Sequence, residues 1–187
     1  MQWGTPAAPR SSRIERGLIM HRDWIPLTQT GPRVTDEDVC HFERSIGHEL
    51  PPDYRAFLLD VNGGYAPSSH CVFRLRKDTT VLNSFYSLNT PNDVGDLASA
   101  QLYPPYPLNN FPEDGIAIGY DGTGSRIVLI LAGRHRGEVW FLDTLNLDDE
   151  ADPHGDWFRR SDALRLAGSF REFVDSLGPQ QTAADAP

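Results

Sequence analysis

The sequence predicts an α+β fold with two N-terminal helices, a central mostly antiparallel or mixed sheet and a C-terminal helix. Three observations predict it: helical spacing of apolar residues early in the chain, strand-like alternation after it, and a second helical pattern near the end. The chain has 187 residues, 39% of them hydrophobic and 23% charged, which is ordinary for one globular domain. We therefore expect a flexible N-terminal segment at 1–22, one domain at 23–177 and a disordered tail at 178–187.

The first predicted helix begins after Thr35, a residue type that caps helix N-termini well. Three acidic residues follow in its first turn, where negative charge suits the helix dipole. Apolar residues then recur at helical spacing as far as Ile46, and Gly47 supplies the stop. A second helix begins at Pro51 and Pro52, because proline fits the first helical turn.

The second helix has an apolar face that begins with Tyr54, and it ends at Asn62-Gly63-Gly64, where the chain must visit positive φ. Strand-like patterns follow, and Arg126 to Leu131 is nearly continuous in β-branched residues and leucine, which suggests a central strand. The other expected strands are 71–76, part of 80–88, 115–119 and 138–142.

Two connections and the final helix complete the prediction. Residues 89–114 form a surface excursion rich in proline and asparagine, with one helical turn at 93–102. Asp121-Gly122-Thr123-Gly124 predicts a tight turn rather than a phosphate loop, because the lysine and the following helix of a phosphate loop are missing. Ser169 and Glu172 form a capping box for the last helix, and Ser161 suggests a further helical turn before it, broken near Gly168.

Charge and composition exclude several classes of function. The formal net charge is −9, from 26 acidic against 17 basic residues, which argues against a nucleic-acid ligand. The sequence has no apolar run of about 18 residues and no secretory leader, so we expect no membrane span and a cytoplasmic location, with Met20 as an alternative start. An acidic surface favours a basic protein partner, although it also serves plain solubility.

No constellation of residues predicts catalysis, so we expect a protein that is not an enzyme. The six histidines form no metal-ligand spacing, and no nucleophile motif occurs. Cys40 and Cys71 are expected to be small buried hydrophobic residues rather than a disulfide or metal ligands. The sequence therefore predicts no catalytic residue, no cofactor and no metal.

Two segments are candidates for contact with a partner. The acidic stretch 143–156 lacks the register of a calcium loop, so it is either a solvated loop or an acidic patch beside aromatic anchors. The run 103–107 offers two tyrosines among prolines, either as a recognition surface or as a rigid loop packed on the sheet edge. The candidate partner-binding residues are Asp148, Asp149, Glu150, Asp152, Asp156, Trp157, Tyr103 and Tyr106.

Segment 50–64, LPPDYRAFLLDVNGG, together with the helix before it, resembles the N-terminal hallmark of the SUKH superfamily, which includes the Smi–Knr regulators and many bacterial immunity proteins. Segments 116–124, 137–141 and 169–173 resemble the later elements of the same family, although Ser125 stands where the family often has an acid. The hallmark residues are Glu43, Leu50, Pro51, Tyr54, Asn62, Gly63 and Gly64.

The resemblance implies a SUKH-like α+β fold and a protein-binding function. Bacterial members of the family commonly act as immunity proteins, so the implied function is neutralisation of a cognate toxin, often a nuclease, by direct binding. The alternative is a regulatory or scaffold protein of the Smi–Knr kind with a host protein partner. Glu43 is either exposed on the first helix or accepts hydrogen bonds from the loop at 62–64, and we favour this second, structural role.

Overall fold

The computed structural model describes residues 24–67, 71–91, 95–102, 111–146 and 156–179. Within this part of the chain it has four α-helices, two short 3-10 helices and seven strands. The helices are α1 (Asp36–Ile46), α2 (Pro52–Asp60), α3 (Leu97–Leu102), η2 (Gly133–His135), η3 (Trp157–Arg159) and α4 (Phe170–Ser176). The strands are β1 (Gly64–Tyr65), β2 (Val72–Arg74), β3 (Thr79–Phe85), β4 (Gly115–Asp121), β5 (Arg126–Ile130), β6 (Val139–Leu142) and β7 (Ala163–Ala167).

The helix ends lie where the capping residues predict them. Thr35 and Asp38 form a reciprocal capping box at the start of α1, and Gly47 ends that helix with a φ of 72°. Ser169 accepts a hydrogen bond from the backbone N–H of Glu172 at the start of α4. The Glu172 carboxylate bonds to the backbone of Gly168 rather than to that of the cap residue, so only half of the predicted capping box forms here.

All the strands pair antiparallel in the order β1-β3-β4-β5-β6-β7, which confirms the predicted α+β fold and the central place of β5. Strands β1 and β2 pair with successive parts of β3, since Tyr65 lies opposite Ser84 and Val72 lies opposite Val81. Isolated bridges from Thr28 to β1 and from Gly178 to β2 extend the sheet beyond this edge.

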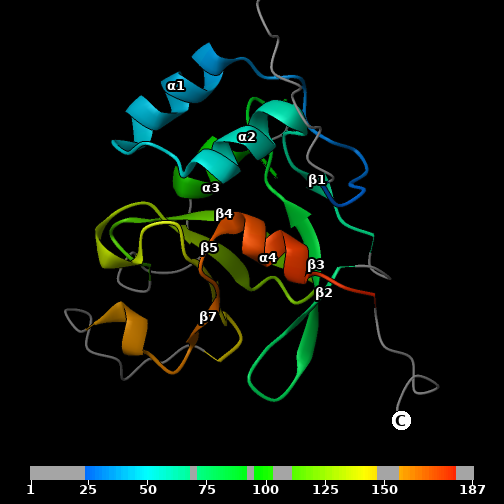
Figure 1. Ribbon diagram of the computed structural model, residues 1–187, viewed down its shortest axis with the longest axis vertical. Coiled ribbons are helices and arrows are strands. Elements are labelled where there is room, and N and C mark those ends of the chain that lie inside the picture. Colours follow the sequence, from blue (N-terminus) through cyan, green and yellow to red (C-terminus); the bar gives the residue numbers. More distant parts are fainter. Residues whose placement is uncertain (1–23, 68–70, 92–94, 103–110, 147–155, 180–187) are drawn as a thin grey trace, which may run out of the picture.

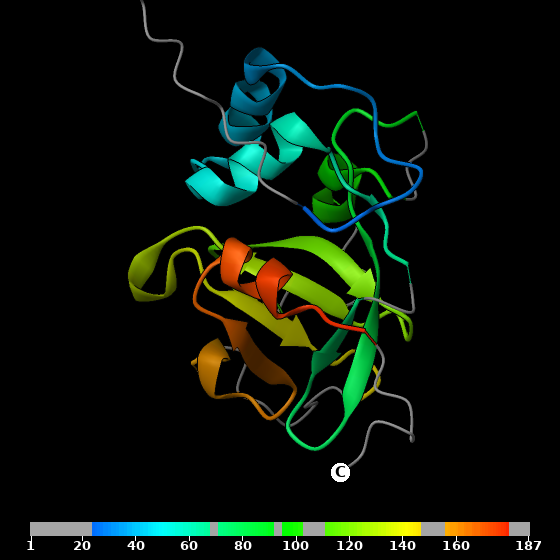
Figure 2. The ribbon, with the colours of Figure 1, turned by 45° about the vertical axis from the view of Figure 1, so that its right-hand side comes forward.

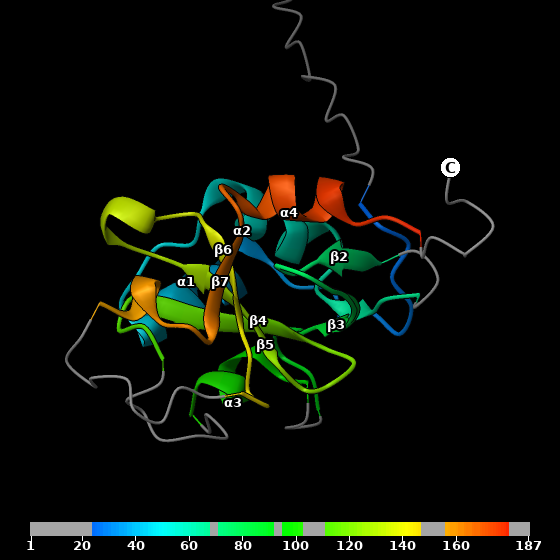
Figure 3. The ribbon, with the colours of Figure 1, turned by 90° about the horizontal axis from the view of Figure 1, so that it is seen from below.

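Helices cover both faces of the sheet. Figure 1 shows α4 crossing in front of the strands, and Figure 2 shows α1 and α2 together at one end of the sheet. Seen from below in Figure 3, α2 and α4 lie on one face and α3 lies on the other. The first face holds the larger core, where the ring of Phe170 packs 4.9 Å from that of Tyr54 and 5.0 Å from that of Phe57. The second face carries a smaller core of Val128, Ile130, Trp140, Leu142, Trp157 and Ala163.

A strand occupies the place where a helical turn was predicted before α4. Residues Ala163–Ala167 form β7, whose Leu164 pairs with Phe141 of β6. The turn signal of Ser161 is local, whereas the exposed edge of β6 offers a whole row of backbone hydrogen bonds, and this tertiary pairing overrides it.

The two cysteines lie in different environments. Cys71 is fully buried in the larger core, as predicted, but Cys40 is exposed on α1 and accepts a hydrogen bond of 3.3 Å from the guanidinium of Arg55. The prediction of two buried cysteines is therefore wrong for Cys40, because its position points away from the Val39 and Phe42 face that α1 buries.

The predicted terminal segments 1–22 and 178–187 fall outside the described residues, apart from 178–179. In the part of the chain that the structure describes, no helix has the length and apolar character needed to cross a membrane.

Candidate functional site

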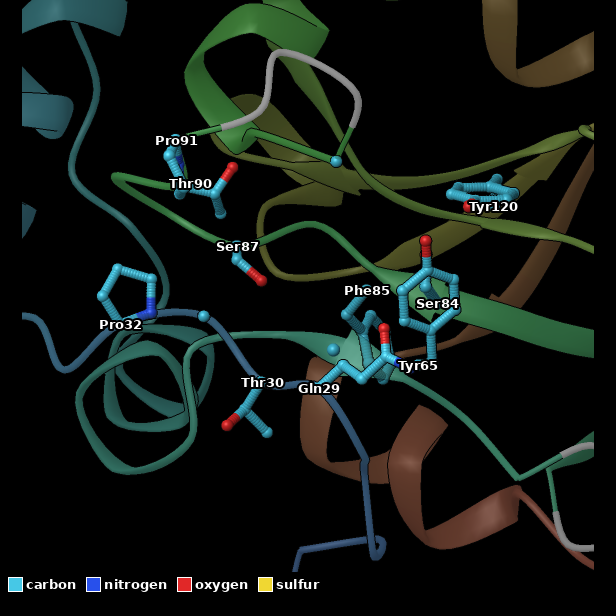
Figure 4. A pocket seen from close by; sticks show the side chains of 13 residues that line it. Gln29, Thr30, Pro32, Tyr65, Ser84, Phe85, Ser87, Thr90, Pro91 and Tyr120 are labelled. Carbon is cyan, nitrogen blue, oxygen red and sulfur yellow. The ribbon is translucent and has the colours of Figure 1, made fainter.

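A hollow of about 280 Å³ lies beside the hallmark residues, between the chain before α1 and the β1-β3-β4 part of the sheet. In Figure 4, Tyr65 and Tyr120 stand on one side of it, and Pro32, Thr90 and Pro91 stand on the other. The described residues that line it are Gln29, Thr30, Gly31, Pro32, Gly64, Tyr65, Ser84, Phe85, Ser87, Thr90, Pro91, Gly95 and Tyr120.

Asn62 joins the segments that form these walls. Its side-chain amide donates to the backbone oxygen of Pro32 at 2.7 Å and to that of Leu88 at 2.8 Å. Its side-chain oxygen accepts from the backbone N–H of Leu88 at 2.7 Å, and its own backbone oxygen accepts from Gly31 at 3.0 Å. Asn62 has a φ of 58° and is buried, so one side chain satisfies backbone groups that would otherwise lie away from water.

The two glycines after Asn62 are required by close backbone contact. Gly63 has a φ of 71°, and a Cβ added there would lie 2.4 Å from the backbone oxygen of Tyr86. Gly64 has a φ of 124°, and its Cβ would lie 2.8 Å from the backbone oxygen of Thr28. Only glycine fits both positions, so the hallmark Asn62-Gly63-Gly64 does more than end α2, because it also shapes the wall of the hollow.

A row of side chains crosses the sheet at one side of the hollow. Tyr65 of β1 lies opposite Ser84 of β3, which lies opposite Tyr120 of β4, which in turn lies opposite Arg126 of β5. Directly opposed residues on neighbouring strands share a face, so these four side chains lie on the same side of the sheet. Tyr65 is 45% exposed, and the ring of Tyr120 packs 5.7 Å from that of the buried Tyr86.

The lining favours binding over catalysis. None of the described lining residues is a carboxylate, histidine, cysteine, lysine or arginine, so this described part of the lining supplies no general base near neutral pH and no metal ligand set. Among the described residues as a whole, no group of three or more such side chains could hold a metal ion. Glycine, serine, threonine and tyrosine make up nine of the thirteen lining residues. Tyrosine, serine and glycine are the residue types that antibody binding loops use for protein recognition.

The other hallmark residues stabilise the helix pair. The carboxylate of Glu43 accepts a hydrogen bond of 2.9 Å from the backbone N–H of Leu50 and lies 3.6 Å from the guanidinium of Arg55. The predicted partner of Glu43, the loop at 62–64, is therefore wrong, because the carboxylate bonds to the loop between α1 and α2. Pro51 occupies the cap position of α2, and Tyr54 is fully buried between α2 and α4.

The turn between β4 and β5 is stabilised by hydrogen bonds to one carboxylate. Asp121 accepts hydrogen bonds from the backbone N–H groups of Thr123 and Ser125 and from the hydroxyl of Thr80. Ser125 accepts a further bond of 3.2 Å from the backbone N–H of Thr144. The tight turn predicted at 121–124 is therefore confirmed, and Ser125 has a structural role.

Most of the predicted partner-binding residues lie outside the described part of the chain: Asp148, Asp149, Glu150, Asp152, Tyr103 and Tyr106. Of the other two, Asp156 caps η3 and pairs with Arg134 at 3.1 Å. Trp157 is only 8% exposed, because it packs on Trp140 in the smaller core. Its ring is thus a core element that supports the start of η3 and offers little surface to a partner.

The hollow itself was missed by the sequence analysis. Its walls come from five separate segments, and no single segment carries a motif for it. The available signal was Gly64-Tyr65, an aromatic residue placed directly after the hallmark glycines, together with Tyr120 at the end of a buried strand.

Comparison with known proteins identifies the family. Residues 33–176 match the SMI1 / KNR4 family (SUKH-1). A Bacillus subtilis (strain 168) protein described as "SPbeta prophage-derived uncharacterized protein YokK" is 30% identical over an alignment 169 residues long, and this match covers 81% of this chain and 78% of that protein. The family match at residues 33–176 covers the helix pair, the sheet and α4. This chain therefore belongs to the SMI1 / KNR4 family (SUKH-1), as the resemblance of segment 50–64 predicts.

Proposed function

We propose that this chain is an immunity protein that neutralises a cognate toxin, such as a nuclease, by direct stoichiometric binding in the cytoplasm. The observation that carries the proposal is the hollow beside Asn62-Gly63-Gly64, because its described lining is rich in tyrosine, serine, threonine and glycine, which suit protein recognition. The chain then acts without cofactor or metal, by covering a surface that the toxin needs.

Family membership supports a binding role, since domains of this family commonly bind protein partners. The description of the Bacillus subtilis relative as prophage-derived is consistent with a part in conflict between genetic elements. The formal net charge of −9 favours a basic partner, because opposite charges raise the association rate and exclude wrong partners.

The second candidate function is that of a regulatory or scaffold protein with a host protein as its partner. Family membership favours this candidate as much as the first, because the family carries the name of the SMI1 and KNR4 proteins. Both functions use binding, so they differ in the identity of the partner rather than in the chemistry of the site.

Co-expression distinguishes the two functions. The test requires a toxin domain encoded beside this chain. That domain is expressed from an inducible promoter, alone and together with this chain, and survival is counted. The immunity function predicts that the chain restores growth and that the purified pair associates. A variant with Tyr54→Ala, which removes a fully buried ring and is expected to destabilise the domain by about 3–5 kcal/mol, serves as the negative control. Failure to protect cells, together with no association of the purified pair, would contradict the immunity function and leave the scaffold function.

A further inference from the structure

Arg126 differs from the other half-buried arginines of the chain. None of the ion pairs formed among the described residues includes it, whereas the half-buried Arg55 and Arg171 each pair with a carboxylate, as does the buried Arg160. Its guanidinium lies 6.0 Å from the centre of the Tyr120 ring, and one terminal nitrogen donates to the backbone oxygen of Gly124 at 2.9 Å. A guanidinium held in this way keeps other N–H groups for a partner.

The position of Arg126 connects it to the hollow. It is the fourth member of the cross-strand row whose first three members, Tyr65, Ser84 and Tyr120, line the hollow. The positive charge of Arg126 also reaches the buried Tyr86 beneath Tyr120, where it opposes the rise in the pKa of the Tyr86 hydroxyl that burial causes. The row therefore runs from the uncharged side chains that line the described part of the hollow to the cation of Arg126.

We propose that Arg126 and Tyr120 form a carboxylate-binding subsite at the edge of the hollow, which receives an aspartate or glutamate from a loop of the protein partner. The planar guanidinium matches a carboxylate in a two-bond geometry, and its hydrogen bond to Gly124 and the Tyr120 ring 6.0 Å away help to hold it in place. Tyr65 and the prolines opposite it contact the uncharged part of the same loop. This inference rests on the proposed function, because it names the chemistry of the partner at that site.

A carboxylate in the docking loop is compatible with a partner that is basic overall. The net charge of the chain acts over distances of about 10 Å and governs the rate of encounter. The pair at Arg126 acts at contact, and it fixes the orientation in which the partner docks. A basic protein with one acidic residue in a protruding loop satisfies both requirements.

The test measures the affinity of the purified chain for the toxin domain encoded next to it, by isothermal titration calorimetry. We expect Arg126→Gln and Tyr65→Ala each to weaken binding by at least about 10-fold, and Arg126→Glu to weaken it further. Arg126→Lys keeps the charge without the two-bond geometry and should recover part of the loss. The matched control is Arg74→Gln, which removes an exposed arginine of β2 and should leave affinity unchanged. Melting temperatures of all variants should equal that of the wild type.

A second arm identifies the partner's carboxylate. Each aspartate and glutamate of the toxin domain is changed in turn to its amide, and its effect is measured against wild type and Arg126→Gln. One of these toxin variants should bind the wild-type chain more weakly than the unchanged toxin domain does. The same toxin variant should bind Arg126→Gln no more weakly than the unchanged toxin domain does, because the two changes remove the same interaction. Binding of the wild type with no effect at Arg126 overturns this inference alone. No binding by the wild type overturns the proposed function, and this inference with it.

Discussion

The side chain of Asn62 and the backbone of Leu88 form a reciprocal pair of hydrogen bonds. The Asn62 Nδ2 donates to the Leu88 oxygen at 2.8 Å, and the Asn62 Oδ1 accepts from the Leu88 nitrogen at 2.7 Å. The side-chain amide of Asn62 thereby donates one hydrogen bond to the Leu88 backbone and accepts one from it, as a residue on a neighbouring antiparallel strand would. Asn62, which follows the last turn of α2, thereby joins the chain after β3 to the chain before α1, and both of these segments line the hollow.

Replacing Asn62 by alanine should lower the free energy of unfolding by about 3 kcal/mol, because several buried backbone groups lose their partners. The matched control is Asn89→Ala, since Asn89 also has a positive φ, 60°, but makes an exposed bond to Asp38. Its expected loss is about 1 kcal/mol, mainly from the backbone conformation. Urea denaturation of both variants measures the difference. Equal losses would show that the backbone conformation, rather than the reciprocal pair, makes Asn62 necessary.

Tyr54→Phe should leave the stability unchanged or raise it by up to about 1 kcal/mol. The Tyr54 hydroxyl is fully buried and has no hydrogen-bond partner among the described residues, and burial raises its pKa far above the usual range. The substitution therefore removes a hydroxyl that gives up its hydrogen bonds to water on folding and gains none in return. Thermal and urea denaturation check this, with Tyr54→Ala expected to lose about 3–5 kcal/mol. A loss above about 1 kcal/mol for Tyr54→Phe would mean that the hydroxyl has a partner such as a buried water.

The capping box of α1 should make stability depend on pH in the acid range. Hydrogen bonds from the side chain and then the backbone of Thr35 lower the pKa of Asp38 below its ordinary 3.8. A carboxyl whose pKa is lower in the folded state adds stability that is complete above the unfolded pKa and is lost as pH falls through the folded pKa. The stability difference between wild type and Asp38→Asn should therefore be constant near neutral pH and shrink as pH falls below 3.8. A difference that stays constant down to pH of about 2 would contradict this assignment.

Reversing three charges in the segment 143–156, with Asp148→Lys, Asp149→Lys and Asp152→Lys together, should weaken binding to a basic partner. Association should slow steeply as salt rises in the wild type and less steeply in this variant. The control reverses three exposed acids elsewhere, Glu37, Glu49 and Asp78, for the same change in net charge. Stopped-flow association at several salt concentrations measures the rates. Equal effects of the two variants would assign the steering to net charge rather than to this segment.

Local chemistry predicted much of the fold. Thr35 and Ser169 cap the helices that begin after them, and Pro51 and Pro52 begin α2, because these effects depend on residues within one helical turn. The order of helices and strands also follows from the change in hydrophobic period. Family resemblance added the expectation of a binding function, which the physical pattern alone does not contain.

Features that depend on pairing between distant segments were missed. β7 forms because the edge of β6 is available, and Trp157 is buried because Trp140 lies beneath it. The hollow likewise needs Ser84 and Tyr120 brought beside Tyr65, and the sheet register determines that these residues lie together. A sequence pattern indicates which secondary structure one segment prefers, but it does not show which distant segments will lie beside it.

The central claim is that this chain acts by binding a toxin rather than by chemistry of its own. Titrating the purified neighbouring toxin domain with purified chain, while recording the toxin's activity on its substrate, tests it most directly. The account predicts that activity falls in proportion to added chain and reaches zero at one equivalent, without cofactor or metal. Toxin activity that persists in a large excess of folded chain would contradict it, as would inhibition that continues to grow with time at substoichiometric amounts.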